Sequence, residues 1–276
     1  MFERFSRSWA LTKASAEVLR SDKELLIFPV ISSIAAILVA ATFLVPILGL
    51  HLLEGGRTGP LGFVVGFLFY VCQYFVIFYF NVALVGAAMI RLEGGDPTVN
   101  DGLRIAWSKA GVILGYAAIA ATVGIILKAA QERAGFLGKI VVGLIGAAWT
   151  VATFLVVPVL VAQDVGPVEA LKESVSLLKK TWGENIIGTG GIGLAFGLII
   201  FAVMLVGVIL ALAASALSPY LAIAFGVITV LAVLLLSVIQ AALSGIYSAA
   251  LYRYAVDGQA PAGFEGGALQ IAFKPK

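Results

Sequence analysis

Charged residues are scarce in this sequence of 276 residues. Asp, Glu, Lys and Arg make up 12% of it, whereas hydrophobic residues make up 61% and the mean hydropathy is +1.08. Soluble domains carry about 25% charged residues, so the composition excludes an ordinary soluble domain and predicts an integral membrane protein. The net charge is only +3, without a concentrated basic patch. We therefore expect no nucleic-acid partner.

Cysteine and histidine occur once each. A lone Cys72 inside an apolar run excludes a disulfide within the chain and is typical of a buried structural thiol. A lone His51 cannot form a multi-histidine metal site, and the sequence has no HExxH, GxSxG or glycine-rich phosphate loop. We expect no catalytic residues, no metal, no cofactor and no enzymatic activity.

Long apolar runs make up most of the sequence. A helix needs about 20 residues to cross a bilayer, and six runs come near or exceed that length. The predicted fold is an all-α integral membrane protein with six transmembrane helices in three hairpins, each hairpin preceded by a cytoplasmic amphipathic helix. Pro158 is expected to interrupt the fourth span. The predicted spans are 25–53, 61–90, 112–127, 140–161, 186–214 and 221–251.

The segment QDVGPVEALKESVSLLKKTWGENIIG, 163–188, is a charged island between two apolar runs. Its Leu171, Val175, Leu178 and Trp182 have the spacing of one helical face, and Pro167 suits a first helical turn. Weaker copies occupy 1–23 and 99–111, the latter with Asn100 or Asp101 as the expected N-cap. A soluble connecting helix is the alternative. The flanking membrane-length runs favour helices that lie on the membrane surface.

The order of a surface helix and then two spans occurs three times. Phe5 matches Leu103 and Leu171, and the span ends ALVGAAMIRLEGGDP and YSAALYRYAVDGQAP resemble each other. This pattern predicts a single membrane domain, 1–255, with internal repeats of about 1–96, 97–165 and 166–255. A cytoplasmic tail, 256–276, follows it.

Lys and Arg concentrate on one side of the predicted spans. Of the 18 in the chain, 14 fall on the side of the three surface helices, and the other side has only Arg57, Lys128, Arg133 and Lys139. Cytoplasmic loops carry the excess of Lys and Arg, so we expect a multi-pass plasma-membrane protein with both termini and all surface helices in the cytoplasm.

The surface helices carry basic residues, which attract anionic lipid, and tryptophans, which suit the headgroup layer. We expect them to contact anionic lipid headgroups or a partner protein. The candidate contact residues are Arg4, Arg7, Trp9, Lys13, Arg104, Trp107, Lys172, Lys179, Lys180 and Trp182.

No predicted span has a charge near its middle, and the deep polar residues are neutral: Gln73, Asn81, Tyr116, Thr122, Thr150, Thr153, Ser237, Gln240 and Ser244. Among these, Gln73 and Asn81 lie in the second span, and Gln240 and Ser244 share one face of the sixth. One interpretation is hydrogen bonding between helices, worth about 1 kcal/mol or less for each residue. The other makes these four residues the lining of a neutral pathway or of an amphipathic ligand's site.

Three stretches carry a resemblance: FERFSRSWALTKAS, FNVALVGAAMIRLEGGDPTVNDGLRIAW and VVPVLVAQDVGPVEALKESVSLLKKTWGE. They resemble a prokaryotic family of multi-pass membrane proteins of unknown function, and the similarity covers nearly the whole chain. The GPVEALKES stretch is also similar to the membrane domain fused to some glycerophosphodiester phosphodiesterases. The resemblance implies a bacterial or archaeal inner-membrane protein. It transfers no catalytic residue, because the phosphodiesterase active site lies in a separate soluble domain.

We therefore expect a non-enzymatic membrane-organising or interaction protein that acts through its basic surface helices. The alternative is a channel or carrier for a neutral or lipid-like solute, assembled as a homo-oligomer. GxxxG pairs near the starts of three spans permit close helix packing, inside the bundle or with another membrane protein chain. They are Gly62 and Gly66, Gly111 and Gly115, and Gly193 and Gly197.

Overall fold

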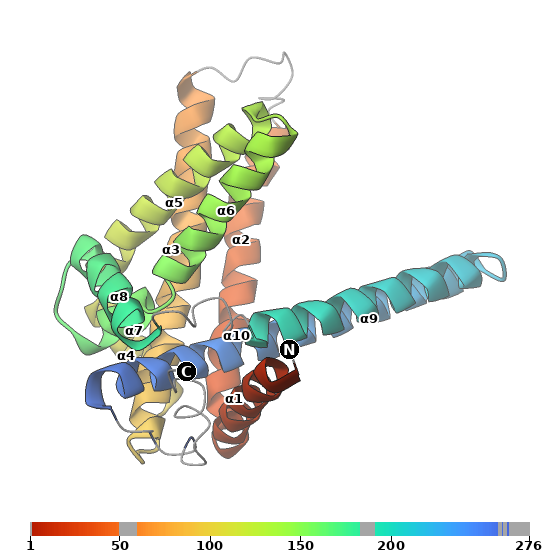
Figure 1. Ribbon diagram of the computed structural model, residues 1–276. Coiled ribbons are helices and arrows are strands. Elements are labelled where there is room, and N and C mark those ends of the chain that lie inside the picture. The colour runs from red at the N-terminus through yellow and green to blue at the C-terminus, as the bar shows by residue number, and fades with distance from the viewer. Residues whose placement is uncertain (1, 50–59, 183–190, 259–260, 262–263, 265–276) are drawn as a thin grey trace.

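The computed structural model describes residues 2–49, 60–182, 191–258, 261 and 264, and in this part of the chain every regular element is a helix (Figure 1). The predicted all-α class is confirmed. The elements are α1 (Phe2–Ser21), the 3₁₀ helix η1 (Lys23–Leu26), α2 (Ile27–Gly49), α3 (Pro60–Leu92), α4 (Val99–Ser108), α5 (Ala110–Arg133), α6 (Phe136–Ala152), α7 (Val156–Ala162), α8 (Pro167–Trp182), α9 (Gly191–Ser215) and α10 (Pro219–Asp257).

Six segments are long and apolar enough to cross a membrane, as predicted. They are Lys23–Val45, Gly62–Leu92, Ala110–Arg133, Phe136–Ala162, Ala195–Ser215 and Pro219–Asp257. Their large apolar side chains are mostly exposed, among them Phe63 on α3, Leu144 on α6 and Phe201 on α9. Apolar surface on this scale marks contact with a membrane or a partner.

The fourth span breaks earlier than the predicted interruption at Pro158. The helix ends at Ala152 and resumes at Val156, which places Pro158 in the first turn of α7. A proline has no N–H to offer the carbonyl four residues before it, and its ring collides with that carbonyl, so the helix must break upstream. Ser174 of α8 satisfies the broken ends, because its hydroxyl donates to Ala152 O (2.7 Å) and accepts from Leu155 N (3.1 Å).

Helix α4 begins one turn before the expected cap at Asn100 or Asp101. Thr98 is the N-cap: its hydroxyl accepts from Asp101 N at 3.3 Å, and the Asp101 carboxylate accepts from Thr98 N at 3.0 Å. This reciprocal pair is a capping box. Asp101 therefore stabilises the start of the helix from its third position.

The buried core lies at one end of the molecule, which we call the base. The base consists of α1, η1, α4, α7 and α8 with the C-terminal halves of α3 and α10. The core runs without interruption through Val82–Val85 of α3 and Leu155–Val157 before and in α7, and it includes Phe28 at the start of α2. Since the other ends of the long helices expose their apolar side chains, the buried packing of the described residues is concentrated in the base.

The short helices of the base pack through small side chains. Gly102 of α4 lies so close to α3 that an added Cβ would stand 2.6 Å from Ala83 O and 2.5 Å from Phe28 Cζ. In α8 the buried residues are Ala170, Ser174, Leu177 and Leu178. The predicted apolar face of α8 is thus rotated: Leu178 is buried, but Leu171 and Val175 are only half-buried. The side chain of Trp182 lies outside the described part.

The long helices do not share one direction. Figure 1 shows α2, α3, α5 and α6 side by side, whereas α9 and the N-terminal half of α10 extend from the base crosswise to them. Helices α9 and α10 pack against each other, and Gly207 faces Thr229 in their contact. Of the predicted GxxxG glycines, Gly115 packs inside the chain, against Pro167, and Gly66, Gly111, Gly193 and Gly197 have open space beside them among the described residues.

Gly102→Ala should lower the free energy of unfolding by about 1–3 kcal/mol, because the added methyl meets the Ala83 backbone carbonyl, which cannot rotate away. Gly111→Ala is the matched control. It lies in α5 with nothing within 4 Å of its Cβ position, and alanine favours a helix by about 1 kcal/mol over glycine. Unfolding of both variants is measured in neutral detergent. Equal stability of the two would contradict the close contact.

Candidate functional site

The base carries the basic residues predicted to contact headgroups or a partner. Lys13 of α1, Arg104 of α4, and Lys172 and Lys179 of α8 are exposed, and Trp107 of α4 exposes 75% of its surface. Arg4, Arg7 and Trp9 belong to α1, and Lys180 and Trp182 to α8, but their side chains lie outside the described residues.

Helices α1, α4 and α8 all lie at the same end of the side-by-side helices α2, α3, α5 and α6 (Figure 1). Each packs against the C-terminal part of a long apolar segment: α4 against α3, α8 against α7, and α1 against α10 (Figure 1). Lys128 and Arg133, at the far end of α5, and Lys139, at the start of α6, lie at the opposite end. The structure therefore brings the exposed cations of the three short helices to one end.

Polar contacts join successive parts of the base. The Glu24 carboxylate accepts from Val99 N at 3.0 Å, so the start of the first apolar segment holds the start of α4. Lys109, between α4 and α5, donates to Gln163 O at 2.9 Å and pairs with Asp164 at 3.2 Å. At the ends of the two longest helices, Arg253 of α10 pairs with Glu93, which follows α3. These contacts lie among partly exposed side chains, where ion pairs add little stability and mainly fix orientation.

Two aspartates of the base titrate away from the ordinary value of 3.8. Hydrogen bonds from the Thr98 side chain and backbone hold the pKa of Asp101 below that value. Asp22 behaves in the opposite way. Its carboxylate accepts from Glu24 N at 3.1 Å, but its second oxygen is buried without a hydrogen-bond partner among the described residues. Burial raises the pKa of Asp22, although this hydrogen bond and the charge of Arg91 oppose the change.

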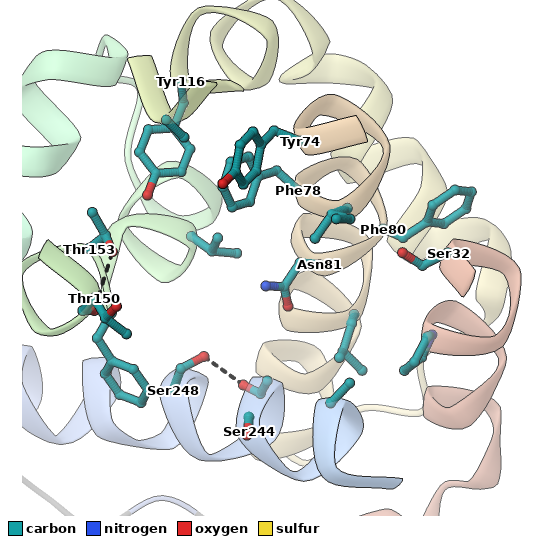
Figure 2. A pocket seen from close by; sticks show the side chains of 18 of the residues that line it. Ser32, Tyr74, Phe78, Phe80, Asn81, Tyr116, Thr150, Thr153, Ser244 and Ser248 are labelled. Carbon is teal, nitrogen blue, oxygen red and sulfur yellow. Dashed lines mark hydrogen bonds between the residues drawn. The ribbon is translucent and has the colours of Figure 1, made fainter. Parts of the chain in front are cut away.

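A cavity of about 560 Å³ lies just beyond the base, between α2, α3, α5, α6, α7 and α10 (Figure 2). Its apolar wall includes Phe78 of α3, Trp149 of α6 and Phe154 before α7. Phe78 is stacked on Tyr74 with ring centroids 5.7 Å apart. The polar lining is Ser32, Ser33, Tyr74, Asn81, Tyr116, Thr150, Thr153, Ser237, Ser244 and Ser248, and none of the lining residues is charged.

Two of the four predicted pathway residues meet at this cavity. Asn81 and Ser244 face each other from α3 and α10 in Figure 2, whereas Gln73 and Gln240 are not among the lining residues. The Gln73 side-chain oxygen is buried without a hydrogen-bond partner in the described part of the chain. Gly245 permits the approach, since a Cβ there would stand 2.5 Å from Leu84 Cδ2 and 3.7 Å from Asn81 Oδ1.

Sequence reasoning missed Ser32, Ser33, Tyr74 and Ser248 as cavity residues. Ser248 follows Ser244 by four positions and so shares its helical face, which is a signal that the sequence contains. Tyr74 precedes Asn81 by seven positions, two helical turns, and so shares its face in the same way. Ser32 and Ser33 have no such signal. Their place in the lining depends on how α2 is rotated in the bundle.

The lining has nine hydroxyls. That of Tyr116 is hydrogen-bonded to the Thr153 side chain, and the other eight divide into two groups. Five donate to carbonyl oxygens of their own chain segment at 2.8–3.2 Å: Ser33, Thr150, Thr153, Ser237 and Ser248. Ser32, Tyr74 and Ser244 form no hydrogen bond with another described residue, and neither does the Asn81 amide. The lining can therefore both donate hydrogen bonds to an uncharged group and accept hydrogen bonds from it. Within the described residues, no three His, Cys, Asp or Glu side chains are grouped to hold a metal ion.

Six apolar helices joined by a charged base define an all-helical, multi-pass membrane protein. A family model described as a family of unknown function, DUF6159, matches residues 60–264, which is most of the chain. The chain belongs to this family. The sequence-based expectation of a membrane-protein family of unknown function is confirmed in this respect. No curated protein matches the chain.

The raised pKa of Asp22 predicts a pH dependence of stability. A carboxyl whose pKa is higher in the folded protein favours folding fully below its unfolded pKa of 3.8, and this contribution is lost as pH rises through the folded value. Asp22→Asn keeps an acceptor for Glu24 N without the charge. Its melting temperature in detergent should therefore lack the decline of the wild type above about pH 4 and should equal or exceed the wild-type value at neutral pH.

Asp22→Ala is the comparison, because it removes the acceptor as well as the charge. Loss of the cap should cost about 1 kcal/mol at every pH. If Asp22→Asn were as unstable as Asp22→Ala at neutral pH, burial of the charge would not be what governs this position.

Proposed function

We propose that the chain is a non-enzymatic, multi-pass plasma-membrane protein whose three basic helices lie on the cytoplasmic surface and engage anionic lipid headgroups or a partner protein. One observation carries the proposal: α1, α4 and α8 are docked at one end of the bundle with exposed Lys13, Arg104, Lys172 and Lys179. Each basic residue near an anionic surface contributes about 1 kcal/mol. Three helices fixed to one base would act on the same leaflet together.

A threefold repeat is part of the proposal, with a surface helix and two spans in each of 1–96, 97–165 and 166–255. Matched positions support it. Gly102 and Ala106 of α4 are buried, and so are their counterparts Ala170 and Ser174 of α8. Gly94 and Gly258, which occupy the same place in the matched span ends, both have positive φ, 86° and 71°. Such a conformation suits glycine and ends a helix.

The packing order also supports the repeat. Each surface helix packs against the second span of the repeat before it, and α1 of the first repeat packs against α10 of the last. Three repeats joined in this way close on themselves. Other parts of the proposal rest on the sequence alone. The cytoplasmic location of both termini rests on the excess of Lys and Arg. The prokaryotic inner membrane and the similarity to the phosphodiesterase membrane domain rest on the sequence resemblance described above.

A second candidate function is a carrier or channel for a neutral or lipid-like solute. The uncharged cavity beside Asn81 and Ser244 favours it, because ligand sites of membrane and soluble proteins are concave, largely apolar and provided with a few polar groups. Flux of a solute through liposomes, or exchange of a lipid between leaflets, is the corresponding measurement.

Removing the base cations should reduce the preference for anionic lipid. In the triple variant Arg104→Gln, Lys172→Gln, Lys179→Gln, the retained phosphatidylglycerol relative to phosphatidylcholine should fall about a hundredfold, because three contributions of about 1 kcal/mol are lost. Lipid retained by protein purified in neutral detergent is measured by mass spectrometry.

The matched control has the same change in charge at the opposite end: Lys128→Gln, Arg133→Gln, Lys139→Gln. These side chains are also exposed. An equal loss of anionic lipid in both triple variants would show that net charge alone attracts the lipid, which would contradict the proposed role of α4 and α8.

The membrane arrangement is tested by labelling single cysteines in a Cys72→Ala background. Six spans with a cytoplasmic base place Ser218, in the turn between α9 and α10, outside the cell and the exposed Ser176 of α8 inside. A membrane-impermeant maleimide should label Ser218→Cys in intact cells, and Ser176→Cys only after lysis. Protection of Ser218→Cys would place the α9–α10 hairpin on the inner surface, crosswise to the other helices.

A further inference from the structure

We propose that the cavity between α2, α3, α5, α6, α7 and α10 binds the polar end of an uncharged, hydroxyl-bearing lipid of the diacylglycerol kind, with the Asn81 amide as its principal hydrogen-bond partner. The inference rests on the second candidate function, and it names the ligand that such a carrier would bind. It is independent of anionic lipid binding at the base.

Part of the polar lining lies near the starts of α2 and α5. Ser33 lies six residues after the start of α2, and Tyr116 six residues after the start of α5. At 1.5 Å for each helical residue, both lie about 9 Å from the base ends of their helices. Both residues therefore lie in the half of a hydrocarbon core, about 30 Å thick, that adjoins the base. A lipid entering from that leaflet can place its polar end there while its chains stay among apolar surfaces.

The hydrogen-bonding groups of the lining suit a ligand that both donates and accepts. Five hydroxyls have already given their hydrogens to carbonyl oxygens, so their oxygen lone pairs are what they offer to the cavity. The Asn81 amide both donates and accepts, and it points into the open space in Figure 2 without a partner among the described residues. A ligand with one O–H and neighbouring ester carbonyls satisfies both kinds of group.

The same lining disfavours a charged headgroup. No Lys, Arg or His lines the cavity to pair with a phosphate or carboxylate, and the oxygen lone pairs repel an anion. No Asp or Glu lines it to pair with an ammonium group either. Burying an unpaired ion in a site of low polarity is costly. The anionic lipids attracted to the base are thus excluded from the cavity.

The size of the cavity suits part of a lipid. A volume of about 560 Å³ lies within the range of sites that hold drug-sized molecules. It would hold the glycerol end and the first part of the chains, and the chains would continue along the walls made by Phe78, Trp149 and Phe154. A small hydroxylic solute such as glycerol would leave those apolar walls uncovered.

The test uses the full chain in neutral detergent with 1,2-dioctanoylglycerol as the probe. Titration followed by native mass spectrometry should show one saturable site for each chain. The analogue with a methylated hydroxyl should bind about tenfold more weakly or worse, because it cannot donate to the lining. Dioctanoyl phosphatidic acid, octylamine and glycerol should not compete for the site.

Asn81→Leu should weaken binding of dioctanoylglycerol by about tenfold. Thr122→Leu is the control: Thr122 is an exposed polar residue of α5 outside the cavity, so its substitution should leave binding unchanged. The comparison of dioctanoylglycerol with its methyl ether uses the unmodified protein and does not depend on either variant folding.

Absence of saturable dioctanoylglycerol binding, equal binding of its methyl ether, or competition by phosphatidic acid, octylamine or glycerol would each overturn the inference. The two other proposals fail separately. Binding without flux or lipid exchange in liposomes would contradict the carrier but not the site. The Arg104, Lys172, Lys179 triple variant should bind dioctanoylglycerol normally even where it has lost anionic lipid.

Discussion

The close docking of short helices onto the ends of long ones is the contact on which the rest of this structure depends. Helix α4 reaches α3 because Gly102 has no side chain to hold it away from the Ala83 carbonyl and Phe28. Helix α8 reaches α7 in a comparable way through Ala170 and Ser174. Lipid chains are as apolar as leucine, so helices in a membrane gain little by hiding apolar surface from one another and associate through close packing instead. In this protein such packing is concentrated in the base.

Backbone polar groups must also find partners, and the break in the fourth span shows how the base provides them. Pro158 prevents a continuous helix, and a broken helix in an apolar environment leaves donors and acceptors that cost several kcal/mol when unpaired. The Ser174 hydroxyl bonds to both sides of the break. Helix α8 thus satisfies the break between α6 and α7, which couples the position of α8 to the shape of the bundle around the cavity.

The distribution of polar groups follows the cost of burying them. Ion pairs such as Lys109–Asp164 and Arg253–Glu93 stay in the base, where solvent reaches them. Away from the ends of the spans the polar residues are neutral, and most of their hydroxyls bond to their own backbone, which makes them compatible with lipid. Asn81 departs from this rule among the described residues. An unpaired amide beside a cavity costs free energy, which a hydrogen bond to a bound ligand or water can offset. A void left by imperfect packing would have an apolar lining, whereas this cavity presents the Asn81 amide.

The sequence by itself determined the helical class, the six apolar segments and the short charged helices, because these depend on the period and length of apolar runs along one chain. It also located Asn81 and Ser244 as polar residues at depth. Only the tertiary structure decided that these two meet while Gln73 and Gln240 do not, and that α8 buries Ala170 and Ser174 instead of Leu171 and Val175. The physical reason is that a helical face in an almost uniformly apolar sequence carries no signal of its neighbour. Each helix is rotated so that its small side chains meet the neighbouring backbone. That rotation decides which side chains line the cavity.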